Sequence, residues 1–292
     1  MGDNTCTTTR PDLGAVPHND PRDSISSDGT AEEKLEAANF SVSLKPHKPF
    51  PPVITGHLTG ARMKSFNLCG ETKNDLLFKV SVHMGYSSHG PLGTRPGIYL
   101  HNGMSVKDPI LAAAGDESQW SARVYAFHNK SVVLLPRLPG EKEETGGGEW
   151  VTETIVSSTT GADVVFRFAV NIPSNEGGSL TRERFQWSKF KKGTDHEYPA
   201  GGYKLFWLPS STDAPDHGCV AVWELGKGVS KYWNHMFTLK FVGDARSELG
   251  NRGQAVVVVT AARLWMMRLQ GKTKKTTISL GEKIGGKSEP AV

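Results

Sequence analysis

Cationic side chains gather in the middle of the chain, where two arginines stand two residues apart and several lysines follow. In an extended strand, Arg182 and Arg184 lie on one face, whereas Phe185 and Trp187 lie on the other. The aromatic pair indicates that its own face points inward, so we expect the arginines to point outward. Two guanidiniums at this spacing, with ammonium groups nearby, can clamp a phosphate through charge-assisted hydrogen bonds.

The predicted phosphate-binding patch comprises five cations on this strand and the loop after it: Arg182, Arg184, Lys189, Lys191 and Lys192. The alternative is a solvated basic face whose side chains form cross-strand ion pairs. Glu183 is on the inward face, so we expect it either near an end of the fold or paired with a buried base such as Arg167.

Two other segments hold secondary anion-binding candidates. Arg95, in a Gly-rich loop, could reach an anion together with Lys107, or it could bond loop carbonyls. Three lysines near the C-terminus either contact acidic lipid or complement the end of a preceding helix: Lys272, Lys274 and Lys275.

Signatures of catalysis and metal binding are absent from the sequence. There is no nucleophile elbow, zinc-protease motif, phosphate-binding loop or dinucleotide-binding fingerprint. The histidines include no pair at metal-ligand spacing, so we expect no metal and no cofactor. The adjacent carboxylates Asp116 and Glu117 are more typical of turn chemistry, and Cys69 and Cys219 of small buried or inert thiols. We therefore name no catalytic residue and favour a non-enzymatic protein.

Charge and cysteine usage narrow the class of protein. The net charge is +4, yet residues 252–287 alone carry eight Lys/Arg and one acidic residue. Such a basic end can meet phosphates or an acidic membrane surface, or it can act as a solvated tail. Three scattered cysteines and the lack of an apolar leader favour a reducing, cytoplasmic location, with peripheral attachment to a membrane left open.

The elements that position these residues are mostly strands, because apolar and polar residues alternate from residue 76 onward. Gly- and Pro-rich turns separate the segments, and helices do not alternate with them, which favours a sandwich or a barrel over a parallel α/β fold. The predicted strands are Leu76–His83, Gly97–His101, Pro109–Ala113, Ser121–Phe127, Ser131–Leu135, Trp150–Val156, Asp163–Val170, Arg182–Trp187, Gly202–Leu208, Cys219–Leu225 and Met236–Val242.

One intensely apolar run, Ala255–Leu269, predicts a long buried helix. It is shorter than the ~20 residues that a membrane span requires, and Arg263 would be costly inside a bilayer. We therefore interpret it as a core helix without a transmembrane span, and Arg263 then needs a partner inside or at the mouth of the fold. A helix that is apolar on all sides needs protein around it, and a sheet closed around it would also remove exposed strand edges.

This order of elements resembles the tubby C-terminal fold, which LURP-one-related proteins and phospholipid scramblases share. The local sequence is similar to that of fungal tubby-like proteins. The resemblance covers roughly residues 60–272. It implies a closed antiparallel β-barrel of about a dozen strands around a hydrophobic C-terminal helix. It also implies recognition of phosphoinositide head groups by exposed cations. The stretches that carry it are Gly90–Gly103, Asp108–Trp120, Phe166–Phe168, Arg182–Trp187 and the helix through Gly271.

The predicted organisation has three parts. Residues 1–55 are rich in Asp, Thr, Ser and Pro and are predicted to be a disordered tail. Acylation at Gly2 or Cys6 stays open, because the start is a near match to a myristoylation signal. Residues 56–272 form the mainly β barrel, with its central helix at about 253–269, and residues 273–292 form a basic flexible tail.

From these features we predict a monomeric module that binds acidic phospholipid or another phosphate-bearing ligand. The alternatives are a protein-interaction scaffold without a small ligand, and an enzyme of specialised metabolism that uses a pocket at the barrel end. Nucleic acid is not an expected partner, because exposed aromatic residues do not interleave with the cations.

Overall fold

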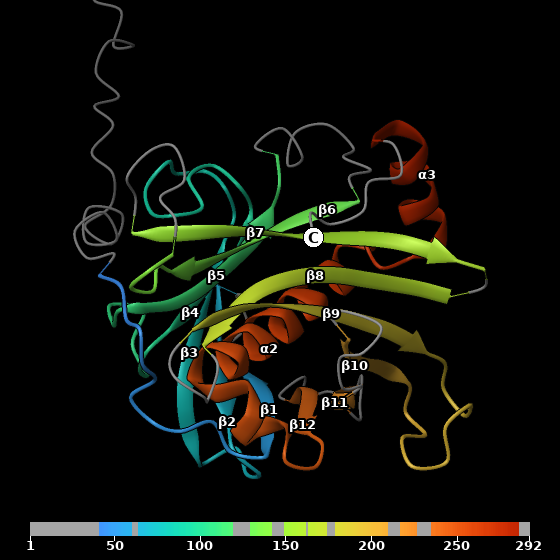
Figure 1. Cartoon of the computed structure of the whole chain (residues 1–292), viewed down its shortest axis with the longest axis horizontal. Coiled ribbons are helices and arrows are strands. Elements are labelled where there is room, and N and C mark those ends of the chain that lie inside the picture. Colours follow the sequence, from blue (N-terminus) through green and yellow to red (C-terminus); the bar gives the residue numbers. More distant parts are fainter. Residues whose placement is uncertain are drawn as a thin grey trace, which may run out of the picture.

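The computed structural model shows a closed β-barrel that surrounds one helix, with a second helix outside it (Figure 1). The structure describes residues 41–59, 64–118, 129–141, 149–161, 163–173, 179–209, 217–226 and 235–285. Within these ranges the barrel has twelve strands: β1 Val53–Leu58, β2 Ser65–Cys69, β3 Leu76–His83, β4 Gly97–His101, β5 Ile110–Asp116, β6 Lys130–Pro136, β7 Trp150–Thr160, β8 Asp163–Pro173, β9 Leu180–Phe190, β10 Gly202–Leu208, β11 Gly218–Leu225 and β12 His235–Phe241.

Each strand pairs antiparallel with the next one along the chain, and β1 closes the barrel by pairing with β12. In the closing pair, Ile54 lies opposite Leu239 and Thr55 opposite Thr238. Because closure leaves no unpaired edge, every strand finds backbone partners on both sides. The predicted mainly β, closed antiparallel barrel is confirmed.

The predicted strands match the observed ones closely from β3 onward. The bounds of β3, β4 and β10 are as predicted, and most of the others are longer by a few residues. The predicted strand Ser121–Phe127 lies outside the described residues. Strands β1 and β2 were not predicted, because each is short and carries polar residues or glycine among few apolar ones.

Helix α2 spans Ala245–Leu269 and runs through the barrel (Figure 1). Every residue from 252 to 267 is buried, as the all-round apolar run predicts. A hydrogen bond of 3.0 Å from Trp187 Nε1 of β9 to Thr260 Oγ1 ties the helix to the barrel wall. Among the helices described, none combines the length and apolar character needed to cross a bilayer.

The central helix begins earlier than the predicted residue 253. Gly250 interrupts α2 with φ 58° and ψ −175°, so a short helical stretch from Ala245 precedes the buried segment at an angle to it. We call the barrel end at which α2 finishes the mouth. The connections β1–β2, β3–β4, β5–β6, β7–β8, β9–β10 and β11–β12 lie at this end, because the strands alternate in direction.

Both predicted domain boundaries need correction. At the N-terminal side, Phe50 is buried and β1 starts at Val53, inside the predicted tail 1–55; residues 1–40 lie outside the described part. At the C-terminal side, residues 275–285 of the predicted flexible tail form helix α3, Lys275–Gly285. Burial of Ile278 against the hydrophobic core holds this short helix in place.

Candidate functional site

The outer face of β9 carries the predicted arginines, and its inner face carries the aromatic pair. Phe185 and Trp187 belong to the hydrophobic core, whereas Arg182 and Arg184 are half-buried on the opposite side of the strand. The predicted orientation of the strand is therefore confirmed. Whether Arg182 and Arg184 can bind a ligand depends on the hydrogen-bond partners that their guanidiniums already have.

Arg182 is held by a carboxylate of the barrel itself. Its two terminal nitrogens bond the two oxygens of Glu153 on β7, one of them at 2.7 Å. Burial raises the pKa of Glu153, and the bonded Arg182 opposes that rise. The pair thus satisfies a carboxylate that would otherwise be costly to bury. This contact is the ion-pairing alternative considered for the basic face.

The neighbouring polar residues of β9 are also engaged. Arg184 donates to the carbonyl oxygen of Pro209, and Gln186 accepts a bond of 2.8 Å from Arg167 Nε. Glu183 accepts a bond of 2.7 Å from Trp207 Nε1, so it does not pair with Arg167. With Arg182 and Arg184 bonded to the protein, neither guanidinium presents a free fork to a phosphate.

Lys189 lies apart from these arginines, on the other face of the strand. It follows Phe185 and Trp187 at alternate positions and pairs with the buried Tyr203 on β10, so it points inward at the mouth. Arg182 and Lys189 are seven positions apart, which corresponds to about 23 Å of extended chain. The five predicted residues therefore do not form one patch.

Lys189 instead meets the end of the central helix. Burial lowers the pKa of Lys189, and the positive charges of Arg268 and Lys191 lower it further. Burial raises the pKa of Tyr203, and the positive charge of Arg268 opposes this rise. We call Lys189, Lys191, Lys192 and Arg268 the mouth cluster.

The mouth cluster concentrates positive charge, because the two carboxylates of the same loop have other partners: Asp195 pairs with Lys204, and Glu197 accepts a bond from Tyr198. Lys191, Lys192 and Arg268 are exposed, and Lys189 is half-buried. Within the described part of the chain, none of the four side chains forms an ion pair. Arg268 was not predicted as a site residue; its place in the last turn of an apolar helix was the available signal. Four cations gathered at one barrel end can attract an anion.

Inside the mouth, three charged groups form what we call the inner triad: Asp116, Arg263 and Lys272. Arg263 is fully buried and donates to Asp116 at the end of β5 and to Ser131 Oγ at 3.3 Å. Lys272 Nζ bonds the two oxygens of Asp116 at 2.7 and 2.6 Å. The predicted need of Arg263 for a partner is therefore confirmed.

The inner triad corrects two predictions. Asp116 is the buried counter-ion of the central helix and not a turn residue; its position at the end of an otherwise apolar strand was the available signal. Lys272, predicted to face acidic lipid or the helix end, bonds Asp116 instead. Burial lowers the pKa of Lys272, Asp116 opposes this effect, and Arg263 adds to it.

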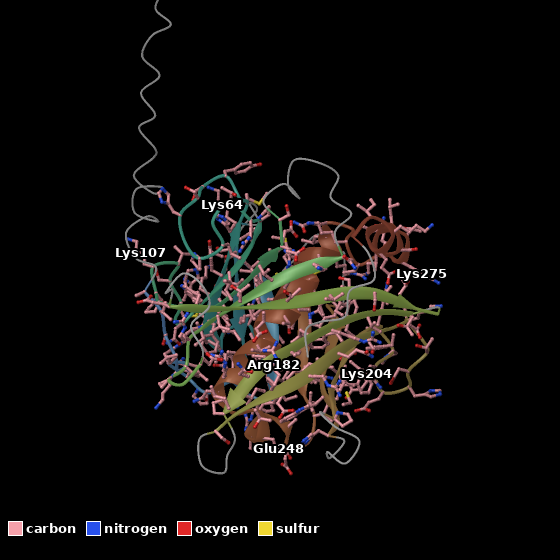
Figure 2. All side chains as sticks on the ribbon, turned by 45° about the horizontal axis from the view of Figure 1, so that its top comes forward. Lys64, Lys107, Arg182, Lys204, Glu248 and Lys275 are labelled. Carbon is pink, nitrogen blue, oxygen red and sulfur yellow. The ribbon has the colours of Figure 1, made fainter. Side chains whose placement is uncertain are left out.

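The remaining secondary candidates are dispersed. Arg95 precedes β4 and Lys107 follows it, so they lie at opposite ends of the barrel. Figure 2 likewise shows Lys107 and Lys275 on opposite sides of the molecule. Lys275 Nζ donates to the carbonyl oxygen of Gly161 at 2.8 Å, while Lys274 is exposed beside it. Arg95, Lys274 and Lys275 thus lie at the same end as the mouth cluster, and Lys107 lies at the opposite end.

Among the described residues, the two cysteines lack the features of a reactive thiol. Burial raises the pKa of the Cys69 and Cys219 thiols, which disfavours the reactive thiolate. Across the residues that the structure describes, no three His, Cys, Asp or Glu side chains come together as metal ligands would.

No protein-family model, no curated protein and no solved structure matches this chain.

Proposed function

We propose that this protein is a non-enzymatic module that binds an anionic, phosphate-bearing group, specifically the head group of an acidic phospholipid, at the mouth of the barrel. The observation that carries the proposal is the position of Lys189. This lysine points inward at the mouth with Arg268 and Lys191 as charged neighbours, and Glu183, the carboxylate on its face of the strand, bonds Trp207 instead.

Crowded like charges raise the free energy of the unliganded protein, and a bound phosphate would relieve that repulsion. Arg268 also complements the negative end of the α2 dipole, which accounts for one cation at this place. Lys191 and Lys192 lie on the β9–β10 loop and do not serve the helix end in that way. A barrel end with exposed cations also agrees with the sequence resemblance to tubby-like proteins. We propose that the chain is related to these proteins through their shared barrel fold.

The test compares two triple variants with equal loss of charge. Lys189→Gln, Lys191→Gln and Lys192→Gln change the mouth cluster, and the control changes the exposed Lys45, Lys73 and Lys107 at the opposite barrel end. Binding of the full chain is measured to phosphatidylcholine vesicles with and without phosphatidylserine or a phosphoinositide. Soluble inositol trisphosphate and inorganic phosphate form the arms that distinguish a free phosphate from a lipid.

We expect the wild-type protein to bind only the anionic vesicles, less tightly at high salt. Each lysine near an acidic surface contributes about 1 kcal/mol, so the mouth variant should bind roughly a hundredfold more weakly. The control variant should lose much less. If the protein binds the soluble phosphates but not the vesicles, its ligand is a free phosphate and not a lipid. Absence of binding to every anion, or equal losses in both variants, would contradict the proposal.

A further inference from the structure

Helix α3 rests on the barrel next to the mouth, close to the ends of β7 and β8 (Figure 1). Its inner face carries the buried Ile278 and the half-buried Glu282. The Glu282 carboxylate accepts bonds from Thr159 N at 3.0 Å and Thr159 Oγ1 at 2.7 Å, and Lys275 bonds the adjacent β7–β8 turn. These contacts fix which face of α3 points away from the barrel.

The outward face carries an apolar pair at helical spacing. Leu280 and Ile284 stand four residues apart and are 39% and 67% exposed. Leu269, at the end of α2, is 41% exposed, and a bond of 3.2 Å from Thr277 Oγ1 to Gly271 O keeps that end close to the first turn of α3. Three large aliphatic side chains thus remain in water near the mouth.

Four exposed cations lie close to this apolar pair along the chain. Lys283 lies on the same outward face, Lys274 and Lys275 lie at the start of the helix, and Arg268 precedes Leu269; all four are exposed. The one carboxylate between residues 268 and 285 is Glu282, which is occupied by Thr159. An apolar ridge with a basic rim is typical of helices that lie in the interface of an anionic bilayer.

We propose that the outer face of α3, with Leu269, is a docking surface for an anionic lipid bilayer, into which Leu280 and Ile284 insert. This inference rests on the proposed function and adds a second, apolar contact to the head-group contact of the mouth cluster. Charge complementarity selects the occupant, because the basic rim matches acidic lipid and the aliphatic pair matches the acyl region beneath it. Electrostatic attraction brings the mouth to the surface, and apolar burial slows its release.

The test replaces Leu280 and Ile284 by serine in the full chain. Its matched control replaces Leu44 and Val106, which are 47% and 44% exposed at other places on the molecule. Sedimentation with phosphatidylcholine/phosphatidylserine vesicles should show roughly tenfold or greater loss for the α3 variant, since apolar burial drives insertion. The control should bind like the wild-type protein, and near-identical thermal unfolding should show that both variants fold.

A second measurement uses the wild-type protein alone. Amide hydrogen exchange in residues 279–284 should slow when anionic vesicles are added and should not change with phosphatidylcholine vesicles. Unaltered vesicle binding by the α3 variant, or unaltered exchange in α3 on bound vesicles, would overturn the docking role while leaving the proposed function intact. Failure of the wild-type protein to bind any anionic vesicle would instead refute the proposed function.

Discussion

At the scale of single residues, the buried charges of this barrel are paired with one another. Arg263 is completely enclosed, and its charge is balanced by Asp116, which also bonds Lys272. At the other end of the barrel, Arg252 is bonded by Glu141 at 2.8 and 3.0 Å. Removing one member of such a pair leaves the other as a buried, uncompensated charge, which is far more costly than the pair itself.

Asp116→Asn should therefore destabilise the protein strongly. The substitution leaves Arg263 in the core without a counter-ion, and the expected loss in the free energy of unfolding is about 3–5 kcal/mol. Urea-induced unfolding measures this loss. Asp163→Asn, at the exposed first residue of β8, is the matched control and should change stability little. Equal stability of the two variants would show that Asp116 does not balance the charge of Arg263.

Buried histidines predict how stability depends on pH. Burial lowers the pKa of His101, although a backbone carbonyl of Asp108 near the ring opposes the shift; burial also lowers the pKa of His235. Below the ordinary value of about 6.5, the unfolded chain therefore binds protons that the folded protein resists. Stability should fall as the pH drops from about 6.5 toward the folded-state pKa, by about 1.4 kcal/mol per pH unit for His101 alone.

His101→Gln should remove that part of the acid sensitivity. Urea unfolding across this pH range should give a shallower dependence for His101→Gln than for the wild-type protein. The exposed His89→Gln should retain the wild-type slope. An unchanged slope in His101→Gln would mean that His101 takes up its proton equally well in the folded and unfolded states.

At the scale of elements, the kink in α2 lets one helix both fill the barrel and make contacts at the end opposite the mouth. Residues before the kink lie outside the buried segment, and Gly250 changes the direction with φ 58° and ψ −175°. A positive φ with an extended ψ is a conformation that essentially only glycine adopts. The buried segment can then start directly at Arg252, whose partner Glu141 lies just after β6.

Gly250→Ala should destabilise the barrel through backbone strain alone. Apart from the adjoining backbone, no heavy atom lies within 4 Å of the added methyl group, so a clash with other parts of the protein does not contribute. The expected loss is about 1–3 kcal/mol, measured as a lower melting temperature or urea midpoint. The neighbouring exposed Asn251→Ala is the control and should have a much smaller effect. A Gly250→Ala protein as stable as the control would mean that the kink relaxes into a continuous helix.

At the scale of the whole molecule, closure of the sheet and enclosure of the helix depend on each other. An open sheet would leave the apolar helix partly in water and two strand edges unpaired. The pairing of β1 with β12 solves both problems, and it places the six connections of the mouth around the end of α2. The mouth cluster arises from this assembly, because Lys189 and Arg268 are far apart in the sequence and share one barrel end.

Local patterns in the sequence determined the β class, most of the strands, the central helix and the inward orientation of Phe185 and Trp187. These features follow from the alternation of side chains on strands and from the all-round apolar character of one helix, which are properties of neighbouring residues. The need of Arg263 for a partner was equally readable, since a charge cannot remain unpaired in a core.

Only the tertiary structure decided which charges meet. The sequence pattern predicted a phosphate clamp at Arg182 and Arg184, but these side chains bond Glu153 and Pro209. It predicted a turn residue at Asp116, but this carboxylate balances the charge of Arg263. Each of these partners comes from a different strand or loop, and their spacing along the chain carries no information about their distance in space. Ion pairs and clusters depend on how closure aligns the strands, so the candidate site moved from the wall of the barrel to its mouth.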